Sequence, residues 1–170
     1  MIESMSRRLV VSACLLGVPC RFDAVSKASE AVRAAVGTYR QRGGEVVAVC
    51  PEELGGLGTP RPAAELRGGD GEAVLLGEAR VVRVADGGDV TNEFLRGARA
   101  AAELGVGATE AILKARSPSC GCGQAHRDGA PRQGDGVFAA LLRREGVSLR
   151  TEEDLLSDAR SSAEGQTPES

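Results

Sequence analysis

The sequence predicts an α/β fold: a single compact, Rossmann-like domain with a mostly parallel sheet of about four or five strands and helices on both faces. Three segments with aliphatic runs, residues 9–13, 45–49 and 111–115, are expected to be strands, and the first has the continuous apolar character of a strand that is covered on both faces. Residues 28–42 lie between the first two runs and show helical periodicity. Strand, helix and strand in this order predict a parallel crossover.

Composition limits the number of domains and the classes of partner. A chain of 170 residues fits one domain, which we expect to span residues 1–156, with a disordered Ser-, Glu- and Gly-containing tail at 157–170. Aromatic residues make up only 2% of the chain, which disfavours binding of single-stranded nucleic acid by stacking. The net charge of −3 and the lack of a large basic block disfavour duplex binding. No apolar run is long enough for a membrane span.

The second half of the chain predicts further elements in order. Residues 73–76 and 80–84 read as the strands of a short hairpin, and residues 92–104 read as a helix with Thr91 as its N-cap. Residues 124–133 are polar, and we expect a loop there. A helix at 137–144 and a short strand at 147–149 follow, and Thr151 is expected to cap a final helix.

Cysteines follow all three predicted parallel strands. Cys14, Cys50 and Cys120 each lie beside a strand end and a loop rich in Gly or Pro, where a core-packing role is poorly supported. Parallel strands bring their carboxyl ends to one edge of a sheet, so these thiols are expected to converge there. The five cysteines cannot all pair internally, and we expect a cytoplasmic protein whose cysteines bind metal or react.

The cysteine spacing favours an iron–sulfur cluster over zinc. Neither the Cys120–Cys122 spacing nor the Cys14–Cys20 spacing is that of a zinc knuckle, and His126 is the only histidine. Three widely spaced thiolates suit a cluster in which one iron lacks a protein ligand and acts as a Lewis acid toward sulfur.

Four polar residues near these cysteines are candidates for chemistry. Glu52 follows Cys50 by two positions and is expected to transfer protons, with a solvated loop acid as the alternative. Ser117 is expected to contact substrate, and Lys114 and Arg61 are expected to hold an anionic group of it. Cys20 lies in the loop after Cys14, where we expect it to support the site without binding iron.

The motifs together resemble a bacterial family, long described as a domain of unknown function, that includes the iron–sulfur thiouracil desulfidases. The resemblance runs from Leu9 to about Leu149 and is carried by the following stretches: Val11-Ser12-Ala13-Cys14-Leu15-Leu16-Gly17 with Cys20-Arg21, Val49-Cys50-Pro51-Glu52, Thr59-Pro60-Arg61-Pro62, Asp89-Val90-Thr91, Lys114-Ala115-Arg116-Ser117-Pro118-Ser119-Cys120-Gly121 and Gly134-Asp135-Gly136-Val137.

The resemblance implies a 4Fe–4S cluster held by Cys14, Cys50 and Cys120, with a thiocarbonyl substrate at the fourth iron. It also implies that Glu52 and Ser117 are the acid and the serine beside the cluster. Cys122 departs from the family pattern and is either a spare thiol or an alternative ligand. Residues 124–133 lack the aromatic-containing stretch of the family.

The favoured interpretation is an enzyme that removes sulfur from thiouracil or a thiouridine derivative by a non-redox, hydrolytic reaction and releases hydrosulfide. The substrate is expected to be a small thiolated base, nucleoside or nucleotide, either 2-thio or 4-thio, with tRNA less favoured. The alternatives are a non-catalytic iron–sulfur or metal-binding protein, acting as a sulfur carrier or redox sensor, and a protein switched by disulfide formation.

Overall fold

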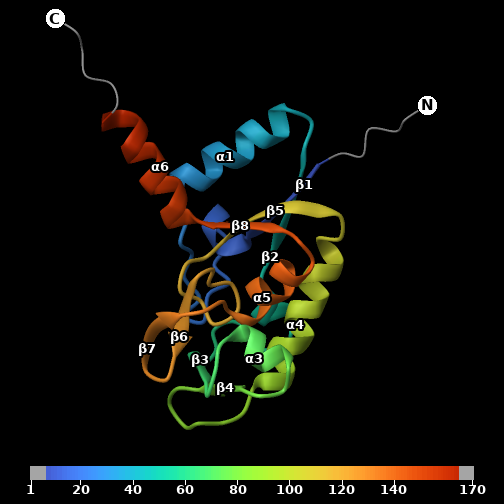
Figure 1. Ribbon diagram of the computed structural model, residues 1–170, viewed down its shortest axis with the longest axis vertical. Helices are drawn as coiled ribbons and strands as arrows, with labels where there is room; N and C mark the ends of the chain where they lie inside the picture. Colours follow the sequence, from blue (N-terminus) through green and yellow to red (C-terminus); the bar gives the residue numbers. More distant parts are fainter. Residues whose placement is uncertain (1–6, 165–170) are drawn as a thin grey trace, which may run out of the picture.

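A parallel sheet of four strands forms the centre of the computed structural model, which describes residues 7–164. The strands lie in the order β2-β1-β5-β8 and all neighbouring pairs are parallel (Figure 1). Their bounds are Arg8–Ser12 for β1, Glu45–Val49 for β2, Ala108–Leu113 for β5 and Ser148–Thr151 for β8. The predicted α/β class, with a largely parallel sheet, is therefore confirmed.

Alternation along β1 explains why helices cover both faces of this sheet. Successive side chains of a strand point to opposite faces. Leu9 and Val11 pack in one apolar cluster with Val32 and Val36 of α1, whereas Val10 packs in another with Phe138 of α5. Figure 1 shows α1 and α6 on one side of the sheet and α4 and α5 on the other. The helices on these faces are α1 (Glu30–Gln41), α4 (Thr91–Leu104), α5 (Val137–Arg144) and α6 (Glu152–Glu164).

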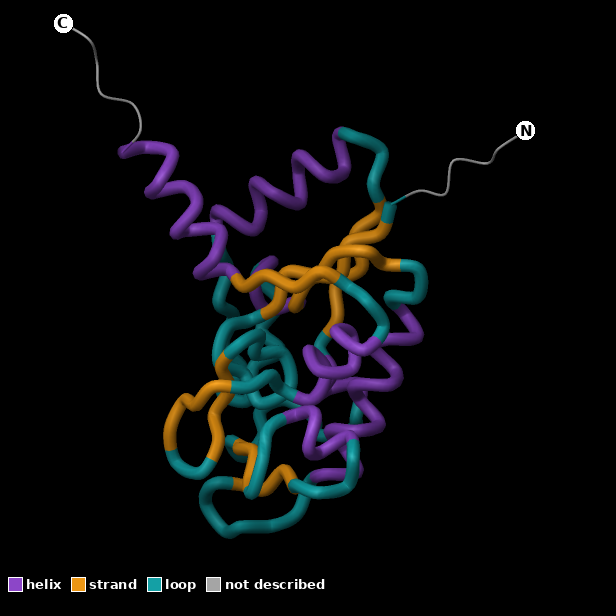
Figure 2. The backbone as a smooth tube through the Cα atoms, viewed as in Figure 1, coloured by secondary structure: helices purple, strands orange, loops and turns teal. Residues whose placement is uncertain are grey.

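A second sheet lies beside the first and was not predicted. Its order is β4-β3-β6-β7, with β3 and β4 antiparallel, β3 and β6 parallel, and β6 and β7 antiparallel (Figure 2). The bounds are Ala64–Arg67 for β3, Arg80–Arg83 for β4, Gln124–Arg127 for β6 and Ala130–Gln133 for β7. No helix among residues 7–164 is long and apolar enough to cross a membrane.

Two predictions in this region were wrong. The expected strand at 73–76 belongs to helix α3 (Gly71–Leu75), because the carboxylate of Asp70 accepts a hydrogen bond from the backbone N–H of Ala73 and caps that helix. Strand β4 therefore pairs with β3 instead of forming the expected hairpin. Residues 124–133 form the β6–β7 hairpin rather than a loop, because Ala125 is buried and the turn of Asp128 and Gly129 adopts positive φ angles.

Two helix ends also differ from the sequence-based expectation. Val90, not Thr91, is the N-cap of α4, since the hydroxyl of Thr91 instead accepts a hydrogen bond from the N–H of Val81. Residues 157–164 are helical and do not belong to the disordered tail that we expected, because α6 continues to Glu164. The next residue in the sequence is Gly165. Residues 165–170 lie outside the described residues.

Thr151 begins α6 as predicted. Its hydroxyl accepts from the N–H of Asp154, whose carboxylate accepts in turn from the N–H of Thr151, which forms a reciprocal capping box.

Short helices at the carboxyl ends of β1 and β2 direct the chain into the site. A 3₁₀ helix, η1 (Ala13–Leu16), follows β1, and helix α2 (Pro51–Leu54) follows β2. Helix α2 approaches α4 closely because glycines lie at the contact, Gly97 in α4 and Gly55 at the C-cap of α2. A Cβ atom on Gly97 would lie 1.8 Å from the carbonyl oxygen of Pro51. The packing of α4 therefore sets the position of α2 and of the residues it carries.

Candidate active site

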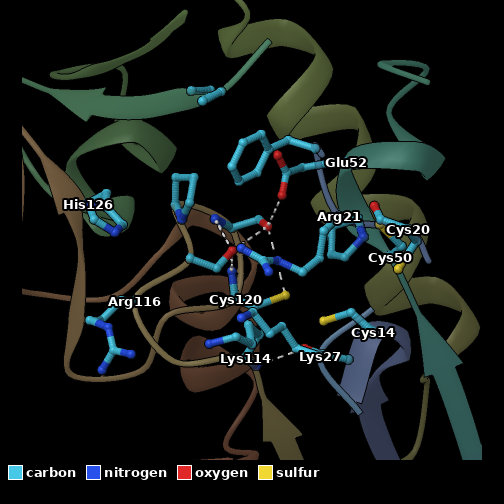
Figure 3. Close-up of a pocket in the computed structure, with 18 of the residues that line it drawn as sticks. Cys14, Cys20, Arg21, Lys27, Cys50, Glu52, Lys114, Arg116, Cys120 and His126 are labelled. Carbon is cyan, nitrogen blue, oxygen red and sulfur yellow. Dashed lines mark hydrogen bonds between the residues drawn. The ribbon is translucent and has the colours of Figure 1, made fainter. Parts of the chain in front are cut away.

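A cavity of about 590 Å³ lies beyond the carboxyl ends of the central strands. Cys14 follows β1, Cys50 follows β2 and Cys120 lies in the loop after β5, and all three line this cavity. Figure 3 shows the sulfur atoms of Cys14 and Cys120 pointing toward one another. Parallel strand order thus brings together thiols that are far apart in the sequence.

Cys20 contributes a fourth thiol to the same cavity. It is 2% exposed, and its carbonyl oxygen accepts a hydrogen bond from the Cys50 thiol at 3.5 Å. The neighbouring Cys14 thiol raises the pKa of Cys20 to about 11. The Cys20 side chain raises the pKa of Cys50, and burial raises the pKa of Cys120 to about 12. These three thiols are therefore protonated at neutral pH, and ligation would replace the protons of Cys50 and Cys120.

The donor set fits an iron–sulfur cluster better than a single ion. Among the described residues, no three Cys, His, Asp or Glu side chains converge closely enough to hold one metal ion. The ligands of a 4Fe–4S cluster bind different irons, so they surround a volume instead of meeting at a point. Cysteines from three loops around one cavity have this arrangement.

Cys122 points to a different environment. It does not line the cavity, and its sulfur accepts a hydrogen bond from Arg143 at 3.4 Å. Arg143 is in turn paired with Asp135 at 2.6 Å. Burial raises the pKa of the Cys122 thiol, so this cysteine is a weak nucleophile as well as a distant one. The geometry favours the spare-thiol interpretation.

Glu52 is joined to the loop of Cys120 through two serines. The Ser119 hydroxyl donates to Oε2 of Glu52 at 3.2 Å, and the Ser117 hydroxyl lies 3.2 Å from that of Ser119. Ser117 also accepts from the backbone N–H groups of Ser119 and Cys120, which fixes the turn. These contacts place a carboxylate and two hydroxyls beside the thiols, an arrangement suited to proton transfer.

Arg61 holds Glu52 from the other side. Its Nε lies 3.4 Å from Oε1 of Glu52, and its terminal nitrogens donate to the carbonyl oxygens of Gly58 and Cys20 and to the hydroxyl of Thr59. The side chain is only 3% exposed. Arg61 thus connects the Glu52 helix with the Cys20 loop and uses most of its donors within the protein.

Lys114 lines the cavity and is ion-paired as well. Its ammonium lies 2.7 Å from Oε1 of Glu152 and 3.1 Å from the carbonyl oxygen of Ala115. The other Glu152 oxygen accepts from the N–H of Ala115. One donor of Lys114 therefore remains for a ligand. Arg116, which also lines the cavity, is paired with Glu153 at 2.5 Å.

Sequence reasoning did not identify Ser119, Arg21 or Lys27 as site residues. Ser119 is 1% exposed, and its neighbours in the Ser-Pro-Ser-Cys turn are the only signal in the sequence that marks it. Arg21 and Lys27 come from the loop between η1 and α1 and bring two more cations to the cavity (Figure 3). Arg21 has only a loose pair with Asp23, at 3.8 Å.

Three comparisons relate the chain to known proteins. A protein-family model described as 2-thiouracil desulfurase matches residues 9–154. The uncharacterized protein YbbK of Bacillus subtilis (strain 168) is 40% identical over 152 residues, which cover 86% of this chain and 97% of that protein. A solved structure described as the 4Fe–4S-dependent thiouracil desulfidase TudS is similar with a TM-score of 0.72 and 39% identity, over 93% of this chain and 99% of that one.

Proposed function

The chain belongs to the 2-thiouracil desulfurase family, and from this premise we propose that it removes sulfur from a thiolated pyrimidine by hydrolysis. The match confirms the resemblance drawn from the sequence motifs. The observation that carries the proposal is the placement of Glu52, held by Ser119 and Arg61, beside a cavity lined by four cysteines. A binding protein for a metal cluster has no need of an oriented carboxylate at that position.

Cys14, Cys50 and Cys120 are the residues proposed to hold a 4Fe–4S cluster, with Cys20 supporting the site. The similar solved structure is named as 4Fe–4S-dependent, which supports this assignment. When bound, a cluster with one iron free of protein ligands supplies a Lewis acid that attracts the thiocarbonyl sulfur and makes the adjacent carbon electron-poor.

Glu52 supplies the proton transfer that the reaction requires. Its carboxylate takes a proton from water, so that the oxygen adds to the carbon of the thiocarbonyl group. The same carboxyl group then returns this proton to the sulfur as the carbon–sulfur bond breaks, and the second proton of the water leaves the new carbonyl oxygen and is released to solvent. Water oxygen replaces sulfur, which departs as hydrosulfide, and the carbon keeps its oxidation state. The reaction therefore consumes neither ATP nor an external reductant.

The substrate contacts proposed here come from the loops around Glu52. Ser117 is proposed to lie against the pyrimidine, although its hydroxyl already accepts from two backbone N–H groups and contacts the hydroxyl of Ser119. Lys114 has one donor for an anionic group of the substrate. Arg61 has less capacity to bind substrate, since Glu52, Gly58, Thr59 and Cys20 accept most of its N–H groups. A small thiolated base, nucleoside or nucleotide fits these contacts, with tRNA less favoured.

Turnover of a thiobase tests the proposal against a non-catalytic sulfur carrier or redox sensor. Protein prepared without oxygen and loaded with iron and sulfide is incubated with excess 2-thiouracil or 4-thiouracil, without ATP or reductant. We expect many equivalents of uracil and hydrosulfide per protein. Release of no more than one equivalent of sulfur indicates a carrier. Equal activity in protein without iron indicates disulfide chemistry instead.

A further inference from the structure

One phenylalanine side chain is exposed in the cavity. The chain has three phenylalanines, and two of them, Phe94 and Phe138, are at most 1% exposed and belong to the core. Phe22 is 39% exposed and lines the cavity. The single tyrosine, Tyr39, is in α1 and does not line it. In a chain with so few large aromatic residues, a phenyl ring left open to a cavity suggests a ligand that covers it.

The backbone of Phe22 is fixed to the Glu52 side of the site. The N–H of Arg61 donates to the carbonyl oxygen of Phe22 at 2.8 Å, and the Arg61 guanidinium holds both Glu52 and the carbonyl of Cys20. The same residue thus links the phenyl ring to the proposed proton-transfer group. A ligand ring placed by Phe22 is thereby placed relative to Glu52.

One face of the phenyl ring already has a partner. The guanidinium of Arg21 lies over it, 5.6 Å from the ring centroid, in a cation–π contact. Arg21 also lines the cavity, and its side chain is 23% exposed, so this contact restricts the ring from one side. Despite this contact Phe22 remains 39% exposed, so ring surface is available to a planar molecule.

We propose that Phe22 stacks on the pyrimidine ring of the substrate and sets the plane in which the thiocarbonyl group is presented to Glu52. This inference rests on the proposed function. Pyrimidines have π faces that stack on aromatic side chains, and loss of one such contact weakens binding measurably. Phe22 does not touch the reacting bond, so it acts on substrate affinity and orientation rather than on proton transfer.

The test compares a planar ligand with a puckered one. The four variants are Phe22→Ala, Phe22→Leu, Phe22→Tyr and Val25→Ala. Val25 is 50% exposed in the same loop but does not line the cavity, so it is the matched control. The ligands are 2-thiouracil and its 5,6-dihydro analogue, which keeps the thiocarbonyl group but loses ring aromaticity. Calorimetry on iron-loaded protein gives Kd, and turnover assays give KM and kcat.

We expect Phe22→Ala and Phe22→Leu to bind the planar thiobase more weakly, with Kd and KM both raised by about tenfold or more and a smaller change in kcat. The Kd of the dihydro analogue should change little, so these variants lose the preference for the planar ring. Phe22→Tyr should keep the preference for the planar ring, because its ring can still stack, whereas Val25→Ala should match the wild type. All variants should retain the iron content of the wild type.

Three results would overturn the inference. Unchanged affinity in Phe22→Ala excludes a contact, equal losses for both ligands exclude stacking, and full affinity in Phe22→Leu indicates a ring that only shields the cavity. The two hypotheses fail separately. If wild-type protein does not turn over any thiobase, the proposed function fails. If it does and Phe22→Ala behaves like the wild type, only the stacking inference fails.

Discussion

The hydroxyl of Ser119 donates a hydrogen bond to Oε2 of Glu52 at 3.2 Å, although the two residues are 67 positions apart in the chain. This contact joins the loop after β5 to helix α2. Arg61 lies against the other oxygen of the same carboxylate, at 3.4 Å from its Nε. Glu52 is therefore held from two sides, and each oxygen keeps a lone pair for water.

Replacement of Glu52 by Gln removes the proposed base but keeps the size and most of the hydrogen bonding of the side chain. We expect Glu52→Gln to retain its iron and to bind thiobase, yet to turn over at least about a hundredfold more slowly, as is typical for loss of a positioned general base. Single-turnover kinetics at several thiobase concentrations measure binding and turnover, and an iron determination measures the iron content. Glu53→Gln is the control, since Glu53 is an exposed neighbour. Near-normal turnover in Glu52→Gln would assign Glu52 a structural role.

The two serines of the Cys120 turn should differ in their effects. Ser119→Ala removes one hydrogen bond to the Glu52 carboxylate, and we expect a decrease of about tenfold in kcat with unchanged iron content. Ser117→Ala removes the acceptor of two backbone N–H groups in the turn and should also lower iron retention. The variants are compared by kcat and by the rate of iron loss to a chelator. A Ser119→Ala variant with full kcat would show that Glu52 needs no support from this hydroxyl.

Removal of single cysteines should identify the cluster ligands. Anaerobically loaded wild type should hold about four irons per chain. Cys14→Ala, Cys50→Ala and Cys120→Ala should each lose the cluster, whereas Cys122→Ala should keep it, because Cys122 lies outside the cavity against Arg143. Iron analysis and the visible absorption of the cluster report the outcome. Cys20→Ala should retain iron but lose it faster in air. Full iron content in Cys120→Ala would refute the ligand set.

Replacement of Lys114 should show whether the protein binds a thiolated nucleotide through its phosphate. Two donors of its ammonium are used by Glu152 and Ala115, which leaves one for a substrate phosphate. We expect Lys114→Gln to raise the KM of a thiolated nucleotide about tenfold more than that of the free base, which is the usual size of one charge-assisted contact. KM values for both substrates are measured on the same preparation. Arg61→Lys is the comparison, and it should impair both substrates equally because it releases Glu52. Equal effects of Lys114→Gln on both substrates would leave Lys114 with a structural role only.

Two helical glycines allow a test of how α4 positions the site. A methyl group on Gly97 would lie 1.8 Å from the carbonyl oxygen of Pro51, whereas a methyl group on Gly37 in α1 meets no atom within 4 Å. Gly97→Ala should lower the free energy of unfolding by about 1–3 kcal/mol and weaken iron binding, because α2 must move. Gly37→Ala should raise the free energy of unfolding by about 0.5–1 kcal/mol, because alanine favours the helix over glycine and its methyl group meets no atom. Urea unfolding followed by circular dichroism measures both. Equal stabilities of the two variants would show that α2 adapts without cost.

The central sheet could be predicted from the sequence because its strands are largely aliphatic, and β1 is buried on both faces. Residues 45–49 and 137–144 were predicted with the bounds that the structure has, since a continuous aliphatic run and a helical period are strong local signals. The strand expected at 111–115 forms as β5 but begins three residues earlier. Thr109 and Glu110 are polar, so the apolar pattern does not indicate where this strand begins.

The second sheet could not be predicted because each of its strands has only four residues, and because the pair β3–β6, which joins its two halves, links distant parts of the chain. Strands β6 and β7 are polar, and Ala125 is their only fully buried residue, so no apolar alternation marks them. The opposite error occurred at 73–76, where a run of four apolar residues could be strand or helix, and the Asp70 cap decided for helix. In the site, the cysteines could be predicted because each lies in a loop rich in Gly or Pro beside a strand end. Ser119 could be identified only from its hydrogen bond to Glu52 in the structure.

The order of the central strands also governs when the protein can receive its cluster. β5 lies between β1 and β8, and it pairs directly with β1, so the loop that carries Cys120 reaches Cys14 and Cys50 only after most of the chain has left the ribosome. On the proposed ligand set, a nascent chain that ends before β5 presents at most two of the three thiols. On that ligand set, a cluster that needs all three thiols can be bound only after β5 and its loop have been synthesised and have joined β1 and β2 at one edge of the sheet.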